Sequence, residues 1–200
     1  MRTRTALLRA AAEVFAARGF AGSSVHRITK HAGVTLGALY WHFPSKEELA
    51  REIVRQQPAQ LKLAGDSTGL QSAVDTTLTW AQNLLDDPIL LAGARLVMDQ
   101  EYFVSDEQEN SYHQWGELIA VALRRACDDG ELLPGIDVDA LARVIVNACT
   151  GAQMHAQLAT RRQDLPERIE EMWRLMLPLV ATPEAGSGIR WSGDRESSAL

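Results

Sequence analysis

Residues 24–49 constrain the fold of this chain more than any other stretch, because they place two short helices on either side of one glycine. Apolar residues at the spacing of one helix face predict a first short helix, which starts after Ser24 as its capping residue. Gly33 supplies the turn, and residues 35–42 predict the second short helix. Such a pair is a helix-turn-helix, whose second helix is shaped to lie in a DNA major groove.

A third helix follows this pair directly. Pro44 ends the preceding helix, and Ser45 and Glu48 have the spacing of a capping box at the start of the next one. We expect this helix to end near Gln57, because Pro58 removes a backbone donor there.

The remaining strong patterns are also helical, and none alternates with the period of a strand. The first expected helix ends at residue 18. The later ones cover about 70–85, 88–98, 107–129, 137 or 139–160, and 165–180. The fold class is therefore all-α, with an N-terminal three-helix DNA-binding domain (1–55) and a C-terminal helical domain for ligand binding and dimerisation (56–182). Residues 61–69 have the composition of a linker, and a separate loop is expected near Ser105 and Asp106. Residues 183–200 are expected to be disordered because they are polar and rich in Gly and Ser.

The charge of the chain is divided unequally. Residues 1–55 carry nine Lys or Arg and four Glu, a net charge of +5, whereas the remainder carries 11 basic and 22 acidic residues, a net charge of −11. A basic head on an acidic body attracts phosphates at one end only. This polarity supports the helix-turn-helix interpretation independently.

The run 33–43, followed by 45–49, resembles the DNA-binding domain of the TetR family of one-component repressors. On this pattern a small or polar side chain meets the DNA, while Leu39 and Phe43 hold the helix on the domain core. Arg2 and Arg4, which precede the first predicted helix, could reach phosphates or a minor groove, or form a mobile tail. The expected DNA-contacting residues are Ser24, Thr35, Leu36, Gly37, Ala38, Tyr40, His42 and Lys46.

Leu36 departs from the family pattern, because many relatives carry Lys or Arg there. A leucine can contact a thymine methyl group but cannot bind guanine through two hydrogen bonds. Each polar residue of the set could instead serve as a helix cap or a solvated side chain, and an ordinary helical hairpin is the alternative for the whole segment.

Enzymatic motifs are not found. The chain has no GxSxG, no phosphate-binding glycine loop and no HExxH, and His26 and His31 have a spacing that separates them on a helix. No cofactor or metal is expected. Cys127 and Cys149 lack metal-ligand spacing, so they are expected to be buried thiols in a reducing cytoplasm, with a redox sensor as the alternative. No apolar run approaches the roughly 18 residues that span a bilayer, so no membrane partner is expected.

The body has tryptophans on several predicted helices. Trp80, Trp115 and Trp173 lie on three of them, and Thr150, Gln153 and Met154 share a fourth. Aromatic side chains around a few polar groups are typical of a small-molecule pocket between helices. Packing in the core is the alternative for each tryptophan.

The body also resembles the γ-butyrolactone receptor group of actinobacterial repressors, through residues 88–96, 115–117, 137–139 and 171–173. The resemblance implies that Trp115 packs against a signalling lactone and that Thr150 bonds its polar end, with Asn147 or Gln153 as substitutes. It implies a ligand-responsive repressor in the cytoplasm, which binds a palindromic DNA operator as a homodimer and is released from it by a small-molecule effector. We expect the two subunits to pair through residues 138–160 and 165–180. The alternatives are an antibiotic or other effector, or a dimeric DNA-binding module without a ligand.

Overall fold

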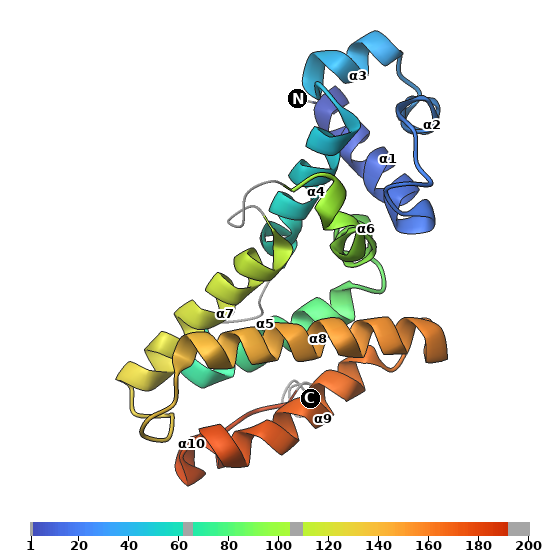
Figure 1. The fold of residues 1–200 in the computed structure, drawn as a ribbon. Coiled ribbons are helices and arrows are strands. Elements are labelled where there is room, and N and C mark those ends of the chain that lie inside the picture. The colour runs from blue at the N-terminus through green and yellow to red at the C-terminus, as the bar shows by residue number, and fades with distance from the viewer. Residues whose placement is uncertain (1, 62–65, 105–109, 192–200) are drawn as a thin grey trace. The chain divides into compact units, whose positions relative to one another are not determined.

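The computed structural model describes residues 2–61, 66–104 and 110–191, and the regular structure in these ranges is helical except for one isolated bridge between Leu132 and Ala181 (Figure 1). The all-α prediction is confirmed. The predicted loop residues Ser105 and Asp106, the expected helix start at 107, part of the 61–69 linker and the last nine residues of the predicted tail lie outside the described residues.

The chain forms two compact units, Met1–Gln60 with Asn83–Gln114, and Leu61–Gln82 with Trp115–Leu200. The first unit contains α1 (Arg2–Arg18), α2 (Val25–Ala32), α3 (Leu36–His42), α4 (Lys46–Gln60), α6 (Pro88–Leu96) and the 3-10 helix η1 (Val97–Tyr102). By packing it extends beyond the predicted 1–55 domain, because Ala92 and Leu96 of α6 and Phe103 after η1 are buried in the same core as α1 and α4.

Side-chain caps start the three helices around the turn, as the sequence predicted. Ser24 Oγ accepts a hydrogen bond from Arg27 N at 3.3 Å, and Thr35 Oγ1 accepts one from Ala38 N at 3.2 Å. Ser45 Oγ does the same for the Glu48 N–H at 3.1 Å. Gly33 has φ of 66°, a left-handed conformation that glycine adopts without strain and that ends α2.

Helix α4 continues through Pro58, so the prediction that Pro58 ends it is wrong. A proline at this position cannot donate to the carbonyl of Val54, one helical turn earlier. The Gln57 side chain donates to that oxygen instead, from Nε2 at 3.4 Å, and it is buried against Gly93 of α6. The replacement of one backbone bond by a side-chain bond explains why the helix does not stop.

The second unit contains α5 (Gly69–Asn83) apart from its last residue, most of α7 (Ser111–Asp128), α8 (Val138–Thr160), α9 (Leu165–Val180) and α10 (Pro183–Ser187). Every residue from Ala73 to Leu78 is buried, so α5 is enclosed along this part of its length. Trp173 of α9 is fully buried and donates its indole N–H to Thr77 Oγ1 at 2.7 Å. This bond joins α9 to the enclosed helix.

Residues 183–191 are ordered, which contradicts the disorder predicted from residue 183 onward. Thr182 caps α10, and Ile189 beyond it is buried. The Arg190 backbone exchanges two hydrogen bonds with the Gln71 side chain, at 2.8 and 3.0 Å. The Arg174 guanidinium lies 4.3 Å from the ring centre of Trp191. Two large apolar side chains thus anchor a segment whose average composition is polar.

Candidate DNA-binding surface and ligand site

Helix α3 is held on the core by one face and exposes the other. Leu39 is fully buried and Phe43, which follows the helix, is nearly so. The expected contact residues on the other side are accessible: Tyr40 is 47% exposed, Leu36, Ala38 and His42 are half-buried, and Thr35 and Gly37 are exposed. A Cβ built on Gly37 meets only the Thr35 hydroxyl, at 4.0 Å, so the backbone there is open to close approach.

Trp41 is the exposed side chain that the sequence analysis did not select. It is 85% exposed on α3, beside Tyr40. Its position in the sequence contained the signal, because residue 41 lies off the stripe made by Leu39 and Phe43. An indole has an N–H donor and a broad apolar face, both of which suit contact with a DNA backbone.

Lys46 and Ser24 are located at the base of the helix-turn-helix rather than on α3. Lys46 Nζ donates to the carbonyl oxygens of Phe20 and Ser23, at 3.0 and 3.3 Å, and lies 3.9 Å from the ring centre of Phe20. Ser24 is exposed, and its hydroxyl caps α2. The ammonium of Lys46 is therefore directed toward the turn between α1 and α2.

A buried carboxylate links α1 to α4 in this unit. Glu52 accepts a hydrogen bond from Arg4 Nη2 at 2.7 Å and pairs with Arg55, and Gln56 Nε2 donates to it at 2.7 Å. Burial alone would raise the pKa of Glu52, but the hydrogen bonds from Arg4 and Gln56 and the two positive charges outweigh it, so the pKa is lowered. Arg2 and Arg4 belong to α1, so the prediction that they precede the first helix is wrong. Arg4 is bound to α4 and does not form the mobile tail that was one of its alternatives. The Arg2 side chain lies outside the described residues.

The two tryptophans predicted to flank a ligand do lie together in the second unit. Trp80 of α5 and Trp115 of α7 are both half-buried, and their ring centres are 6.5 Å apart with planes inclined by 64°. This edge-to-face pair leaves part of each ring open to a further contact. Trp173, by contrast, is enclosed and bonded to Thr77, so it is a core residue.

The candidate ligand residues of α8 differ in how far they are exposed. Gln153 is buried and accepts from Arg162 Nε at 3.0 Å, while Asn147 and Met154 are exposed. Thr150 is half-buried, and its hydroxyl donates to Val146 O at 2.9 Å, which leaves its oxygen as an acceptor. All four residues lie on α8, as predicted, and residues 147, 150 and 154 have the i, i+3, i+7 spacing of one helix face.

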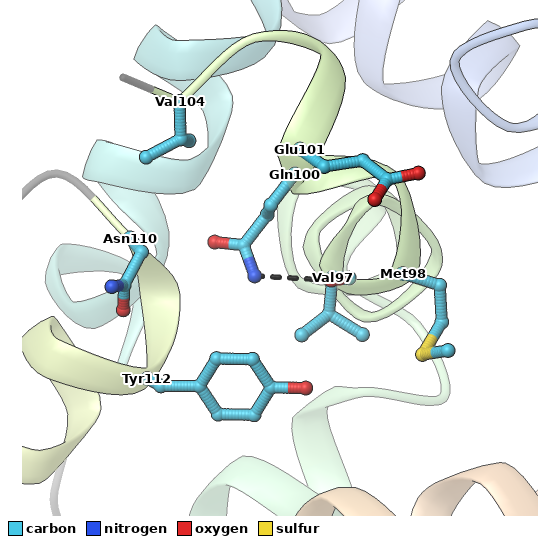
Figure 2. Close-up of a pocket in the computed structure, with 7 residues that line it drawn as sticks. All are labelled: Val97, Met98, Gln100, Glu101, Val104, Asn110 and Tyr112. Carbon is cyan, nitrogen blue, oxygen red and sulfur yellow. Dashed lines mark hydrogen bonds between the residues drawn. The ribbon is translucent and has the colours of Figure 1, made fainter. Parts of the chain in front are cut away.

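A cleft of about 370 Å³ lies in the first unit, beside η1 and the start of α7. Figure 2 shows the ring of Tyr112 extending toward Val97 and Met98, with Gln100 above it and Asn110 and Val104 on the other side. The volume is within the range of small-molecule sites. Sequence reasoning missed this cleft because its residues follow no helical or strand periodicity.

The cysteines differ in environment. Cys149 is buried as expected, and burial raises the pKa of its thiol to about 12, so it remains protonated. Cys127 is exposed, which contradicts the expectation that both are buried. Among the described residues no helix is both long and apolar enough to cross a membrane, and no three His, Cys, Asp or Glu side chains are grouped as metal ligands would be.

Two family models match the chain. Residues 7–53 match the model described as bacterial regulatory proteins, tetR family, and residues 67–181 match the tetracyclin repressor-like C-terminal domain. The A-factor receptor protein of Streptomyces griseus is 33% identical over 196 residues, which are 96% of this chain and 69% of that protein.

Solved structures agree with these matches. The crystal structure of full-length TylP, a TetR regulator from Streptomyces fradiae, superposes with a TM-score of 0.85 and 38% identity, over 98% of this chain and 95% of that chain. A γ-butyrolactone receptor described as ArpA-like superposes with a TM-score of 0.70 and 29% identity, over 92% and 90% of the two chains. The helix-turn-helix, the helical body and these matches together show that the chain belongs to the TetR family of DNA-binding transcriptional regulators and is not an enzyme.

Proposed function

We propose that this protein is a cytoplasmic homodimeric repressor that binds a palindromic operator and is released from it by a small molecule of the γ-butyrolactone type. The observation that carries the proposal is the exposed face of α3, with Tyr40 and Trp41 accessible on a head of net charge +5. The similarity to the A-factor receptor supports the choice of signal.

The operator-contacting surface consists of α3 and the cap that begins it. The Tyr40 hydroxyl and the Trp41 indole N–H are donors for phosphate oxygens, and Thr35 and His42 add two more polar groups. Leu36 and Ala38 are small or apolar and half-buried, so they suit contact with a thymine methyl group. Specificity through shape and methyl contacts therefore fits this helix better than guanine recognition.

The dimer surface that we propose lies on α8 and α9. Both helices expose large apolar side chains: Val144 is 54% and Leu158 86% exposed on α8, and Leu175 is 76% and Leu179 73% exposed on α9. A Cβ at the exposed Gly151 of α8 would meet nothing, so a second helix can approach closely there. A two-fold operator requires a two-fold protein, and this face of the two packed helices is suited to an isologous interface.

The proposed effector site is the pair of Trp80 and Trp115. Two half-buried rings in edge-to-face contact offer apolar surface to an acyl chain or a lactone ring. Thr150 is the proposed partner for the polar end of the ligand, since its oxygen can still accept a hydrogen bond. The cleft of about 370 Å³ beside η1 is another place where a small-molecule effector fits.

Operator binding is tested by selecting duplexes from a random library with the full-length protein and measuring affinity by fluorescence anisotropy. Tyr40→Phe should weaken binding about fivefold, the effect of one lost hydrogen bond. Tyr112→Phe makes the same chemical change on α7 and should leave affinity unchanged. Equal affinity of the Tyr40 variant and the wild type would remove this hydroxyl from the interface.

Ligand control is tested on the same complex with a synthetic 2-acyl-γ-butyrolactone and with extracts of bacterial cultures. Trp115→Ala should keep operator binding and lose release. Release at an unchanged dose would place the effector elsewhere, and loss of folding would make Trp115 a core residue. Release by extracts but never by the lactone would favour a different class of effector, and no release by either would favour a module without a ligand.

A further inference from the structure

The turn between α1 and α2 is held at one peptide unit by side chains from two other elements. The backbone N–H of Phe20 donates to Asp99 Oδ2 of η1 at 2.9 Å. Its carbonyl oxygen accepts from Lys46 Nζ, at the start of α4, at 3.0 Å, and the same ammonium reaches Ser23 O at 3.3 Å. Both polar groups of Phe20 are thus bound by charged side chains, which form shorter and stronger hydrogen bonds than neutral ones.

The ring of Phe20 is fixed as well. It is 6% exposed, and its centre lies 6.0 Å from that of Phe15 and 5.2 Å from that of Phe103. Lys46 Nζ lies 3.9 Å from the ring centre, within the range of a cation–π contact. Backbone and side chain of this residue are therefore held by α1, α4 and the segment that includes η1.

The neighbouring glycine permits this arrangement. Gly19 has φ of +68°, and a Cβ there would be 3.1 Å from Asp99 Oδ2, closer than ordinary packing. The Asp99 carboxylate can approach the turn because residue 19 has no side chain.

The turn leads directly into the helix-turn-helix. Ser23 is buried and donates its hydroxyl to Gly19 O at 2.6 Å, and Ser24 is the cap of α2. The position of this turn therefore sets where α2 begins, and α3 follows α2 after the single turn at Gly33.

We propose that Lys46 and Asp99 are positioning residues for operator binding, which fix the turn at Phe20 and thereby the placement of α2 and α3. This role rests on the operator binding proposed above. It assigns the half-buried Lys46 to the turn at Phe20. It also makes η1 a working part of the DNA-binding unit, although η1 follows α3 by more than 50 residues of sequence.

Electrostatics and positioning predict opposite signs for Asp99. If charge alone matters, removing the negative charge of Asp99 strengthens binding to DNA, and removing Lys46 lowers the slope of log affinity against log salt by about 0.9. If the two residues position the turn, each substitution weakens binding and leaves the salt slope unchanged.

The experiment measures affinity of the full-length protein for its selected operator over a series of salt concentrations. Asp99→Asn and Lys46→Gln should each weaken binding about fivefold at constant slope, and Lys46→Arg, which can still donate to both carbonyls, should restore most of the affinity. The double variant should be little weaker than either single one, because both act through Phe20. Glu101→Gln, the same kind of charge change at an exposed residue of η1, is the matched control and should not weaken binding.

Hydrogen exchange gives a readout that does not require DNA. The Phe20 amide should exchange faster in Asp99→Asn and at the wild-type rate in Glu101→Gln. Wild-type or tighter operator binding by Asp99→Asn, or a salt slope lowered by about one in Lys46→Gln, overturns the proposal. A wild-type chain that selects no operator overturns the proposed function itself, and this role with it.

Discussion

The hydrogen bond from Trp173 to Thr77 is the interaction whose removal should most clearly destabilise the second unit. The two residues are 0% and 5% exposed, and the indole nitrogen lies 2.7 Å from the hydroxyl oxygen. Thr77→Val keeps the size of the side chain but leaves the indole N–H buried without an acceptor, which costs about 1–3 kcal/mol. The added methyl group recovers under about 1 kcal/mol. We expect a net loss of about 1–2 kcal/mol in the free energy of unfolding.

A double-mutant cycle isolates this bond from the other effects. Trp173→Phe removes the donor and part of a fully buried ring, and should cost about 2–3 kcal/mol, mainly through the space that it leaves. In the double variant no indole N–H remains to be unsatisfied. The coupling energy between the two positions should therefore be about 1–2 kcal/mol.

The measurement is urea unfolding followed by far-UV circular dichroism, with each transition fitted separately because the chain has two units. Thr76→Val is the matched control. That residue is also buried on α5, and its hydroxyl donates to Ser72 O at 2.7 Å, as the Thr77 hydroxyl donates to Val74 O at 2.9 Å. Equal losses for the two threonine variants, or a coupling energy within about 0.5 kcal/mol of zero, would refute the reasoning.

Three further predictions follow from burial and packing. The pKa of Glu52 in the folded protein lies below its usual value of 4.5. Its contribution to stability is therefore present above pH 4.5 and is lost as pH falls through the lower folded pKa. In thermal melts over a series of pH values, Glu52→Gln should reduce the loss of stability at acid pH. Leu175→Glu should give monomers in size-exclusion chromatography with light scattering, while Val121→Glu, 61% exposed on α7, should leave the dimer intact. Gly93→Ala should lower the melting temperature because its Cβ meets a buried carboxamide of α4, whereas Gly116→Ala on α7, where a Cβ would meet nothing within 4 Å, should not.

The sequence predicted the helices around the DNA-binding turn well because short-range chemistry determines them. The caps at Ser24, Thr35 and Ser45 act within three residues of themselves, and Gly33 needs no distant partner to adopt its conformation. The boundaries of α8 and α9 were also predicted closely. Asp137 caps α8 through Ala140 N at 3.0 Å, but Asp164, expected to cap α9, makes no side-chain cap and instead accepts from Arg168 and Thr160.

Features that depend on distant residues were not predictable in this way. Pro58 does not end α4, because the Gln57 side chain, packed against Gly93 of the distant helix α6, replaces the missing donor. The segment after Pro183 is ordered because Ile189 finds a buried site that its own neighbours in sequence do not provide. Lys46 was predicted only as a DNA contact, because nothing local to it reveals that its ammonium donates to two carbonyls of the preceding turn.

The candidate sites divide along the same line. The exposed face of α3 could be predicted from a motif, although Trp41 was overlooked. The nearness of Trp80 and Trp115 was predicted and is present, at 6.5 Å between ring centres. For the candidate ligand residues of α8, the sequence did not predict which are buried and which are exposed, because that depends on how α8 packs against other helices.

The bond between Gln57 and Val54 has a mechanical consequence for α4. A helix resists bending through its ladder of backbone hydrogen bonds, and at Pro58 one rung is carried by a side chain. A side-chain rung has rotatable bonds of its own, so the helix can curve there while the rung follows, without opening the backbone ladder on either side. Packing against α6 therefore influences how easily α4 bends at Pro58. The Gln57 carboxamide fits against α6 only because Gly93 has no side chain, so a shift of α6 would change the room available to this hydrogen bond.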